Sequence, residues 1–312
     1  MEKIFDSSFL ISIGMTKTQF DKYIKDAPKK YKVYKIKKKK GGFRTIAHPA
    51  RNLKIIQREL VSKFETDFHF KIHKMSFAYK KNVSIKDNAV THLNAKFLLK
   101  MDFYDFFNSI SFPMFEKLIT ESGYKISKPD MKKIAKILFW SPKGSTKDDV
   151  LSVGAPSSPY ISNIMLYEFD NYINEASIEM GIKYSRYADD LTFSGESLRD
   201  LKKISSIVKD TLLNLFDNKI IVNELKTVII SPGFNKFVTG ITLTEDGSIS
   251  IGRKRKRLIF SLTHKFSLDL LEPDKISYLR GLLSFAFSIE PILKKRLEKK
   301  YGFHVMNKLL KS

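Results

Sequence analysis

The chain has 312 residues, no cysteine and a formal net charge of +23 at pH 7. The lack of thiols excludes disulfides and cysteine–zinc centres and leaves a reducing, cytoplasmic location as the expectation. Hydrophobic residues make up 43% of the chain and charged residues 29%, which indicates a globular fold, and the excess of Lys and Arg favours a nucleic-acid partner bound more weakly as salt rises. No apolar run is long enough for a membrane helix, and residues 9–13 are too few for a signal peptide.

The N-terminal part of the chain combines predicted helices with one predicted hairpin. Residues 8–25 have the amphipathic spacing of a single helix, and residues 53–64 predict a second helix. Between them, residues 31–36 and 44–47 are short β-type runs that predict a hairpin. The basic run at residues 29–40 is either a solvated face or part of a stripe that lines a duplex.

An acidic cluster follows an apolar run in residues 98–107, which read LLKMDFYDFF. The apolar run predicts a strand over residues 97–103 with Asp102 at its end. Asp105 is expected to cap or start the following helix rather than to bind a metal. The segment therefore brings one carboxylate to the end of a probable buried strand.

A turn of small residues, VGAPSSPYISN over residues 153–163, leads into the helix-like run 164–169. Gly154 and Ala155 leave room for the backbone to approach a nucleotide or a template base, and the Ser-Pro steps start a helix. Taken alone, the segment is equally an ordinary helix N-terminus.

The tetrapeptide Tyr187-Ala188-Asp189-Asp190 lies between two β-type stretches and predicts a hairpin with both aspartates at its turn. Two carboxylates about 4 Å apart repel by roughly 4 kcal/mol at an effective dielectric of 20, so a site that keeps both ionised needs cations. Asp-Asp alone is also good turn chemistry. Together with Asp102, however, the pair supplies the hard oxygen ligands of a two-metal nucleotidyl transferase, provided that the segments lie on adjacent strands.

The rest of the chain predicts further sheet and then helices. Residues 200–216 predict a helix that supports the sheet, and residues 237–243 predict another strand of that sheet. A hairpin is expected between residues 238–243 and 248–252. A basic run begins at Arg253, after which the apolar residues recur at a helical spacing typical of a core: Leu279, Leu282, Leu283 and Phe287.

The order of the Asp102 segment, the 153–163 turn, the YADD turn and the run NELKT at residues 223–227 resembles the palm motifs of bacterial retron reverse transcriptases. Two other segments are similar to features of the retron enzymes in particular: NAVTH at residues 88–92, and Val238-Thr239-Gly240. By themselves, the first is only a polar helix or loop and the second only a strand step that ends in glycine. The resemblance covers nearly the whole chain.

The resemblance implies an α+β fold, a right-hand polymerase in three parts. Residues 1–95 would form the fingers and N-terminal helices. Residues 96–245 would form the palm, an antiparallel sheet with helices that carries the catalytic motifs. Residues 246–312 would form the end of a β-hairpin and a small helical thumb that binds RNA.

The resemblance also implies the roles of the acidic residues. Asp102, Asp189 and Asp190 would hold two Mg²⁺ ions, with the carbonyl of Phe103 as an extra ligand. Lys226 would lie near the triphosphate and assist protonation of the leaving group. An exposed lysine without a catalytic role is the alternative for Lys226.

Several nucleotide contacts are implied in the same way. Arg44 resembles the fingers arginine whose planar fork grips a triphosphate, with help from Lys38 or Lys39. Phe107 would lie beneath the sugar and exclude a 2′-hydroxyl, and core packing is its alternative role.

The small-residue turn would contact the nucleotide through Gly154 and Ala155. Val153 departs from the family pattern, since many reverse transcriptases have glutamine at this position. We interpret the valine as a subgroup difference, because every metal-binding position is intact.

The family implies an unusual substrate and several partners. Retron reverse transcriptases recognise a structured noncoding RNA and start DNA synthesis at the 2′-hydroxyl of an internal guanosine, which gives a branched RNA–DNA product. Besides dNTPs and this RNA, the expected partners are a host RNase H that trims the template and an effector protein encoded nearby for phage defence. The expected RNA contacts are Asn88, His92, Val238, Thr239, Gly240, Arg253 and Arg255.

Two other functions stay open from the residues. One is a reverse transcriptase of the group II intron or CRISPR-associated kind, against which the NAVTH and VTG segments argue. The other is an RNA-binding scaffold with a vestigial polymerase site, against which the intact aspartates argue.

Overall fold

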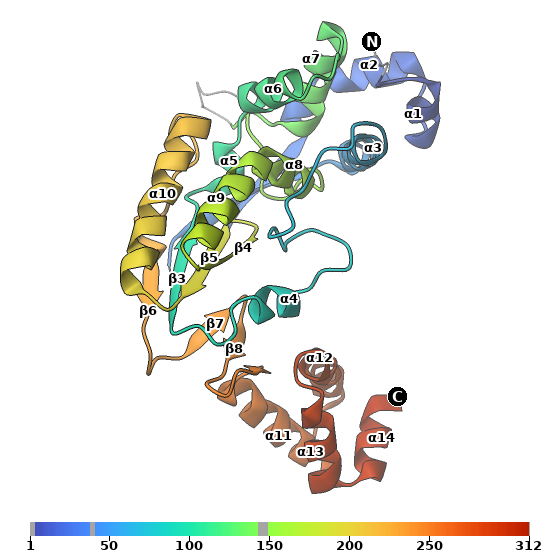
Figure 1. Ribbon diagram of the computed structural model, residues 1–312. Coiled ribbons are helices and arrows are strands. Elements are labelled where there is room, and N and C mark those ends of the chain that lie inside the picture. The colour runs from blue at the N-terminus through green and yellow to red at the C-terminus, as the bar shows by residue number, and fades with distance from the viewer. Residues whose placement is uncertain (1–3, 38–40, 143–148, 312) are drawn as a thin grey trace.

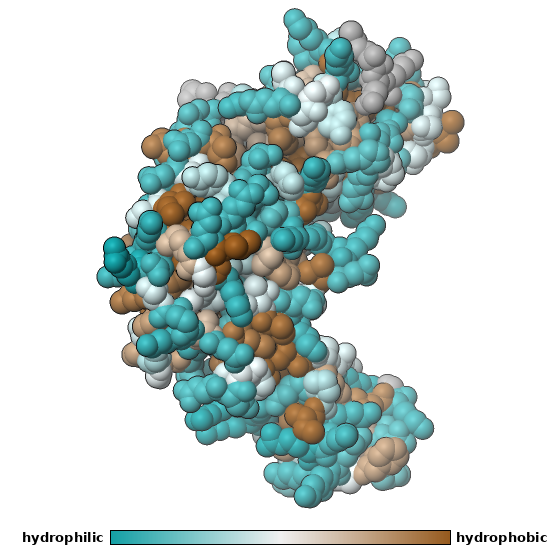
Figure 2. Space-filling view, viewed as in Figure 1, coloured by the Kyte–Doolittle hydropathy of each residue, from teal (hydrophilic) through white to brown (hydrophobic). Residues whose placement is uncertain are grey.

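The computed structural model describes residues 4–37, 41–142 and 149–311. The elements form an open arc (Figure 1), with the N-terminal helices at one end, a central sheet in the middle and the C-terminal helices at the other end. The space-filling view shows mainly hydrophilic side chains on this face and a hollow on the inner side of the arc (Figure 2). None of the helices described is long and apolar enough to cross a membrane.

The N-terminal segment differs from the predicted single helix over residues 8–25. It forms two helices, α1 (Ser7–Ser12) and α2 (Lys17–Lys25). Gly14 interrupts them with a φ of +65°, and Thr16 starts α2 with a capping box that it shares with Gln19. A left-handed residue followed by a strong N-cap ends one helix and begins another, so the single-helix prediction was wrong.

The predicted hairpin is confirmed in strands β1 (Tyr31–Lys37) and β2 (Phe43–Pro49), which are antiparallel and follow the short 3₁₀ turn η1 (Ala27–Lys29). Helix α3 (Arg51–Asp67) comes directly after β2, and it contains the predicted helix at residues 53–64.

The central sheet has the strand order β4 (Lys183–Tyr187), β5 (Asp190–Gly195), β3 (Phe97–Asp102) and β6 (Val228–Ile230), and all neighbours are antiparallel. Helices α9 (Tyr167–Glu179) and α10 (Leu198–Phe216) pack against this sheet (Figure 1). The sequence prediction required Asp102 and the YADD turn to lie on adjacent strands, and the pairing of β3 with β5 confirms this.

Shorter helices connect these elements. Asp105 stands at the N-cap of its helix, as expected, but its side chain makes no capping bond and instead accepts a hydrogen bond from Asn108. The Ser-Pro step at Ser158 does start a helix, as predicted. The helices are α4 (Ile85–Val90), α5 (Phe106–Ser109), α6 (Phe112–Glu121), α7 (Lys128–Leu138) and α8 (Ser158–Met165), together with the 3₁₀ turn η2 (Glu224–Lys226).

A second sheet corrects the prediction for residues 237–243. Instead of one strand of the central sheet, they contribute to two strands, β7 (Lys236–Val238) and β8 (Ile241–Leu243), of a separate sheet that β9 (Ile249–Ser250) completes. Thr239 and Gly240 have φ values of +46° and +79°, the conformation of a two-residue hairpin turn. The VTG segment is therefore a tight turn and not a strand step, and only β8 makes the predicted pairing with β9.

The C-terminal part is helical, as predicted: α11 (Arg253–Ser267), α12 (Pro273–Ile289), α13 (Ile292–Tyr301) and α14 (Phe303–Lys311). Leu279 and Leu283 of α12 are fully buried in a core that these helices share with the second sheet. The rest of the molecule is built around a larger core, which extends from the N-terminal helices to the central sheet. The division into fingers, palm and thumb at residues 95 and 245 stays a prediction.

Candidate active site

The backbone register brings three carboxylates to one end of the central sheet. Asp102, the last residue of β3, lies directly opposite Asp190, the first residue of β5. The carbonyl of Asp189 accepts a hydrogen bond of 3.0 Å from the backbone N–H of Phe103. Antiparallel pairing thus fixes the three aspartates at neighbouring backbone positions.

The three carboxylates perturb one another. Burial, followed by the charges of Asp189 and Asp102, raises the pKa of Asp190 to about 6, although its side chain keeps exposed surface. Burial and the charge of Asp102 also raise the pKa of Asp189. Crowded, partly desolvated carboxylates of this kind gain stability from a cation, which favours their ionised form.

A cation of the chain itself already contacts this centre. The ammonium group of Lys226 donates to both carboxylate oxygens of Asp102, at 2.7 and 2.8 Å. The side chain of Lys226 is 55% exposed, whereas that of Asp102 is 9% exposed. Lys226 therefore reaches in from the surface to the acidic centre, and its position near the triphosphate stays a prediction.

The donor set suits a hard divalent cation. Mg²⁺ prefers carboxylate and carbonyl oxygens, and the strand register brings three aspartates to the same end of the sheet, where Lys226 already contacts Asp102. Within residues 4–37, 41–142 and 149–311, no three His, Cys, Asp or Glu side chains are already arranged as a metal cage. The two oxygens of Asp102 that a metal ion would take are hydrogen-bonded to Lys226.

The small-residue turn packs against the β1–β2 hairpin. The N–H of Ala47 donates to the carbonyl of Val153 at 3.0 Å. Gly154 has a φ of +124°, and a Cβ atom on it would lie 3.1 Å from the carbonyl oxygen of Ala47 and 3.2 Å from Ile46. Glycine is therefore required for close approach to the hairpin, in addition to the predicted approach to a nucleotide. Ala155 is buried, so its small side chain serves packing.

The other predicted nucleotide contacts lie around this centre. Arg44 is exposed on β2, and its positive charge counteracts the rise in the pKa of Asp189. Phe107 is partly buried on α5, with its ring centroid 5.3 Å from that of Phe106. Lys38 and Lys39 lie outside the described residues.

Sequence reasoning missed Tyr79, which lies beside the YADD turn. The backbone N–H of Phe77 donates to the carbonyl of Arg186 at 2.8 Å, so residues 75–77 run along β4 toward the YADD turn. Tyr79 is 53% exposed and has a φ of +62°, which is strained for a residue with a side chain. Burial and then the charge of Asp189 raise its pKa. No sequence pattern marks this position, because the pairing that places it is tertiary.

The predicted RNA contacts divide into buried and exposed groups. His92 is fully buried, and its two ring nitrogens are hydrogen-bonded to Ser194 Oγ at 2.8 Å and Ser185 Oγ at 2.7 Å. Burial lowers the pKa of His92 to about 3, so the ring is neutral. The side chains of Asn88 and Val238 are also enclosed. Direct RNA contact by these three side chains was a wrong expectation, because no surface of theirs is accessible.

The accessible group lies at the start of α11. Arg255 is exposed and donates to the carbonyl of Gly240 at 2.6 Å, which ties the helix to the VTG turn. Thr239 is partly exposed and donates to the carbonyl of Ile85 at 3.2 Å. Arg253 is exposed at the first position of the helix.

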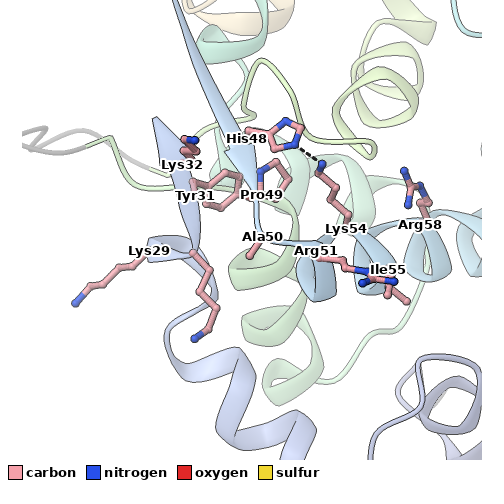
Figure 3. Close-up of a pocket in the computed structure, with 11 residues that line it drawn as sticks. Lys29, Tyr31, Lys32, His48, Pro49, Ala50, Arg51, Lys54, Ile55 and Arg58 are labelled. Carbon is pink, nitrogen blue, oxygen red and sulfur yellow. Dashed lines mark hydrogen bonds between the residues drawn. The ribbon is translucent and has the colours of Figure 1, made fainter. Parts of the chain in front are cut away.

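A basic pocket lies at the base of the hairpin, between β1, β2 and the first turns of α3 (Figure 3). Its cavity measures about 890 Å³, and no acidic residue is among the described residues that line it. Lys54 and His48 point toward each other and form a hydrogen bond. The positively charged lining residues are Lys29, Lys30, Lys32, Arg51, Lys54 and Arg58.

Comparisons with known proteins agree with this geometry. Residues 36–279 match the family model described as reverse transcriptase (RNA-dependent DNA polymerase). The chain is 43% identical to the Retron Ec83 reverse transcriptase of Escherichia coli over 285 residues, which covers 91% of each chain. It is 31% identical to the Retron Ec73 reverse transcriptase of the same species, covering 96% of this chain and 94% of the relative.

A solved structure of apo telomerase from Candida Tropicalis is 14% identical, with a TM-score of 0.49, over 90% of this chain and 61% of that one. The family model spans more than half of the chain, and the two retron enzymes match this chain over nearly its whole length. The chain is an RNA-directed DNA polymerase and belongs to the family of bacterial retron reverse transcriptases.

Proposed function

We propose that this polymerase copies part of a cognate structured RNA into DNA, starting from the 2′-hydroxyl of an internal guanosine, and so makes a branched RNA–DNA molecule. The observation that carries the catalytic part is the direct opposition of Asp102 and Asp190 beside Asp189 on paired strands. The retron priming mode rests on the likeness to the retron enzymes.

In the proposed reaction, the primer hydroxyl loses its proton to solvent and attacks the α-phosphate of a dNTP, an O–P bond forms, and the bond to pyrophosphate breaks. Asp102, Asp189 and Asp190 would hold two Mg²⁺ ions, with the carbonyl of Phe103 as an extra ligand. When bound, Mg²⁺ activates the hydroxyl and neutralises charge on the phosphates. Lys226 would release Asp102 and offer its proton to the departing pyrophosphate.

Substrate binding is assigned to the residues around the acidic centre. Arg44, on the exposed end of β2, would pair with triphosphate oxygens. Gly154 would keep the turn at residues 153–157 close to both the hairpin and the nucleotide. The basic pocket beneath the hairpin would attract template phosphates, since six cationic groups line it.

Phe107 is proposed to select dNTPs by blocking a ribose 2′-hydroxyl. Its partial burial supports this role, because the ring is held by Phe106 and keeps some surface. Phe107→Ala is expected to admit ribonucleotides in a single-nucleotide extension assay. If the mutant rejected rNTPs as strictly as wild type, the phenylalanine would be a core residue only.

Recognition of the cognate RNA is assigned to the start of α11 and the adjacent loop. Five basic residues in sequence, Arg253 to Arg257, begin this helix, although the N-terminal end of a helix repels positive charge by about 0.3–1 kcal/mol per group. Lys256 pairs with Glu290, and Arg255 is tied to Gly240. The unfavourable charge is relieved by an anionic ligand, and RNA phosphates supply one.

Exposed aromatic residues line a groove beside the start of α11. Phe234 is 74% exposed and Phe237 is 46% exposed, and both line a cavity of about 900 Å³ together with Arg253 and Arg255. Unpaired RNA bases stack on such rings, whereas duplex grooves offer no exposed base faces. The groove therefore suits a loop of a structured RNA.

The proposed biological setting is phage defence. A host RNase H would trim the RNA template, and an effector encoded nearby would be restrained or guided by the enzyme with its RNA–DNA product. The likeness to retron enzymes alone supports this part.

The test is to sequence the nucleic acid that copurifies with the protein from its native host, with and without debranching treatment. Wild type is compared with the Asp189→Asn/Asp190→Asn variant. A discrete DNA joined to structured RNA, absent from the variant, is the expected result.

The other outcomes would overturn the proposal in distinguishable ways. RNA alone in both preparations would indicate an RNA-binding scaffold. Unbranched, heterogeneous cDNA would indicate a reverse transcriptase of the group II intron or CRISPR-associated kind.

A further inference from the structure

A buried ionic network lies directly beneath the catalytic turn, and none of its members is among the residues assigned so far. Arg186, in β4, is the largest fully buried side chain of the described residues. It precedes the YADD turn by one residue and is separated from solvent on all sides. A guanidinium cannot lose its charge in a protein, so it must be paired wherever it is buried.

The pairing partner is Asp170 of α9, which is also fully buried. Arg186 Nε and Nη2 donate to the two carboxylate oxygens of Asp170, at 2.8 and 2.6 Å. Tyr184 adds a hydrogen bond of 2.7 Å to the same carboxylate. The two-pronged contact fixes the plane and the position of the guanidinium group.

The remaining nitrogen of the fork points at the catalytic turn. Arg186 Nη1 donates to the carbonyl of Ala188 at 3.0 Å and to Asn163 Oδ1 at 3.1 Å. Ala188 has a φ of +57°, a left-handed conformation that is unfavourable for alanine. Such strain persists only when surrounding contacts hold it, and the bond from Arg186 is one of them.

Asn163 of α8 extends the network to the neighbouring loop. Its Nδ2 donates to the carbonyl of Ala78 at 3.0 Å, and its Oδ1 also accepts from Ser76 Oγ at 3.0 Å. The residue after Ala78 is Tyr79, the second left-handed residue beside the acidic centre. One network thus holds two strained backbone positions, at Ala188 and at Tyr79.

We propose that Arg186 is a positioning residue for DNA synthesis: through the carbonyl of Ala188 it fixes the backbone that carries Asp189, and through Asn163 it fixes Tyr79 in the same frame. A buried ion pair adds little net stability compared with apolar residues of similar volume, so geometry is the better account of its presence here. Groups that orient metal ligands affect metal affinity or activity by about 10–100-fold.

The first variant to test is Arg186→Lys, which keeps the positive charge beside Asp170 but loses the fork. The expected rate of single-nucleotide incorporation on a preformed primer–template is lower by about 10–100-fold, with a higher Mg²⁺ concentration at half-maximal rate. The affinity for the primer–template is expected to be unchanged, because the phosphate contacts lie elsewhere.

A second readout does not depend on catalysis. In metal-free enzyme, backbone amides of residues 187–190 are expected to exchange hydrogen at least about 10-fold faster in Arg186→Lys than in wild type, since local opening sets this rate. Amides of β3 are expected to keep their wild-type exchange.

If Arg186→Lys does not fold, the network can be tested with a second variant, Asn163→Ala. It leaves the Arg186–Asp170 pair intact and removes the bond to Ala78. We expect a drop in incorporation rate of about 3–10-fold and faster exchange confined to residues 76–79.

The matched control is Val208→Ala, a buried position on α10, a helix that contributes no residue to the network. It is expected to lower the unfolding temperature while leaving incorporation below that temperature at the wild-type level. The proposal is overturned if Arg186→Lys loses activity only in proportion to its unfolded fraction, or if exchange at residues 187–190 stays at the wild-type rate. The assay uses a supplied primer, so its outcome is independent of the branched-priming proposal.

Discussion

The palm and the start of α11 differ in how their charged side chains are arranged. At the palm, charged groups are paired: Asp102 with the partly exposed Lys226, and the fully buried Asp170 with the fully buried Arg186. At the start of α11, Arg253 and Lys254 are exposed and have no ion-pair partner among the described residues. In our interpretation both surfaces bind phosphate groups, but only at the palm are the charged side chains held in position by ion pairs.

This difference follows from what each surface must do. A reaction needs atoms placed within fractions of an ångström, and buried bidentate contacts provide that placement. Attraction of a phosphate backbone needs only charge at short range, and flexible exposed side chains provide it. Single substitutions in the palm should therefore reduce DNA synthesis strongly. Substitutions on the α11 surface should reduce RNA affinity gradually, in proportion to the charge that they remove.

The largest effect is expected for Asp102→Asn. The change removes one ligand charge and frees Lys226, so DNA synthesis should fall by about 10³-fold or more. Primer extension with a supplied primer measures the loss, and RNA affinity should stay at the wild-type level. Synthesis within a few-fold of wild type would remove Asp102 from the catalytic centre.

A backbone change at Gly154 tests how tightly the hairpin is coupled to the palm. Gly154→Ala would strain a φ of +124° and place Cβ 3.1 Å from the carbonyl of Ala47. We expect a loss of about 1–3 kcal/mol in the free energy of unfolding and a higher KM for dNTPs.

The matched control is Gly281→Ala in helix α12, where no atom lies within 4 Å of the added Cβ. It should stabilise the protein by about 0.5–1 kcal/mol, because alanine favours a helix more than glycine does. Equal effects of the two substitutions in chemical denaturation would contradict the close-packing argument.

On the α11 surface, Arg253→Gln/Lys254→Gln should weaken binding of the cognate RNA and lower the salt dependence by about two charges. Folding stability should be unchanged or slightly higher, since both charges oppose the helix dipole. Filter binding across a salt series measures this.

Lys202→Gln/Lys203→Gln on α10 carries the same charge change at another exposed site. If this control weakened RNA binding as much as the α11 variant, net charge rather than the α11 surface would account for the affinity.

The smallest expected effect is a pH dependence of stability. The pKa of Asp190 is raised to about 6, so its contribution to stability is present below the unfolded value near 3.8 and is lost as pH rises through 6. In metal-free buffer, Asp190→Asn should therefore be more stable than wild type at pH 7.5, by about 1 kcal/mol after solvent screening, and similar at pH 4. Thermal unfolding at both pH values tests the direction of this stability difference. Mg²⁺ should reduce the difference in stability between Asp190→Asn and wild type at pH 7.5.

The structure and the sequence agree best in the central sheet. The apolar run before Asp102 predicted one strand, and the β-type stretches on either side of the YADD turn predicted a hairpin. The pairing of the two followed from the need to gather three carboxylates. Local patterns suffice there because an apolar run marks β3, β-type residues flank the YADD turn, and the turn residues stand where the chain reverses.

The predictions failed where a short segment had two local interpretations. Residues 237–243 have strand-forming composition except at Gly240, and the left-handed pair Thr239-Gly240 divides them. Threonine rarely adopts such a φ, so sequence favours continuation of the strand, whereas packing in the second core enforces the turn. The prediction that His92 contacts RNA failed for a related reason, since a polar residue in a polar segment gives no sign that it is buried.

By itself, the sequence determined which three acidic residues to consider, and the resemblance of its motifs to those of retron reverse transcriptases indicated the family and the fold class, because motifs are read along the chain. Tertiary structure alone decided that Asp170 and Arg186 meet beneath the YADD turn, that Tyr79 lies beside it, and that Gly154 must have no side chain. Each of these contacts joins segments far apart in the sequence, and their energies depend on distances that exist only after the chain has folded.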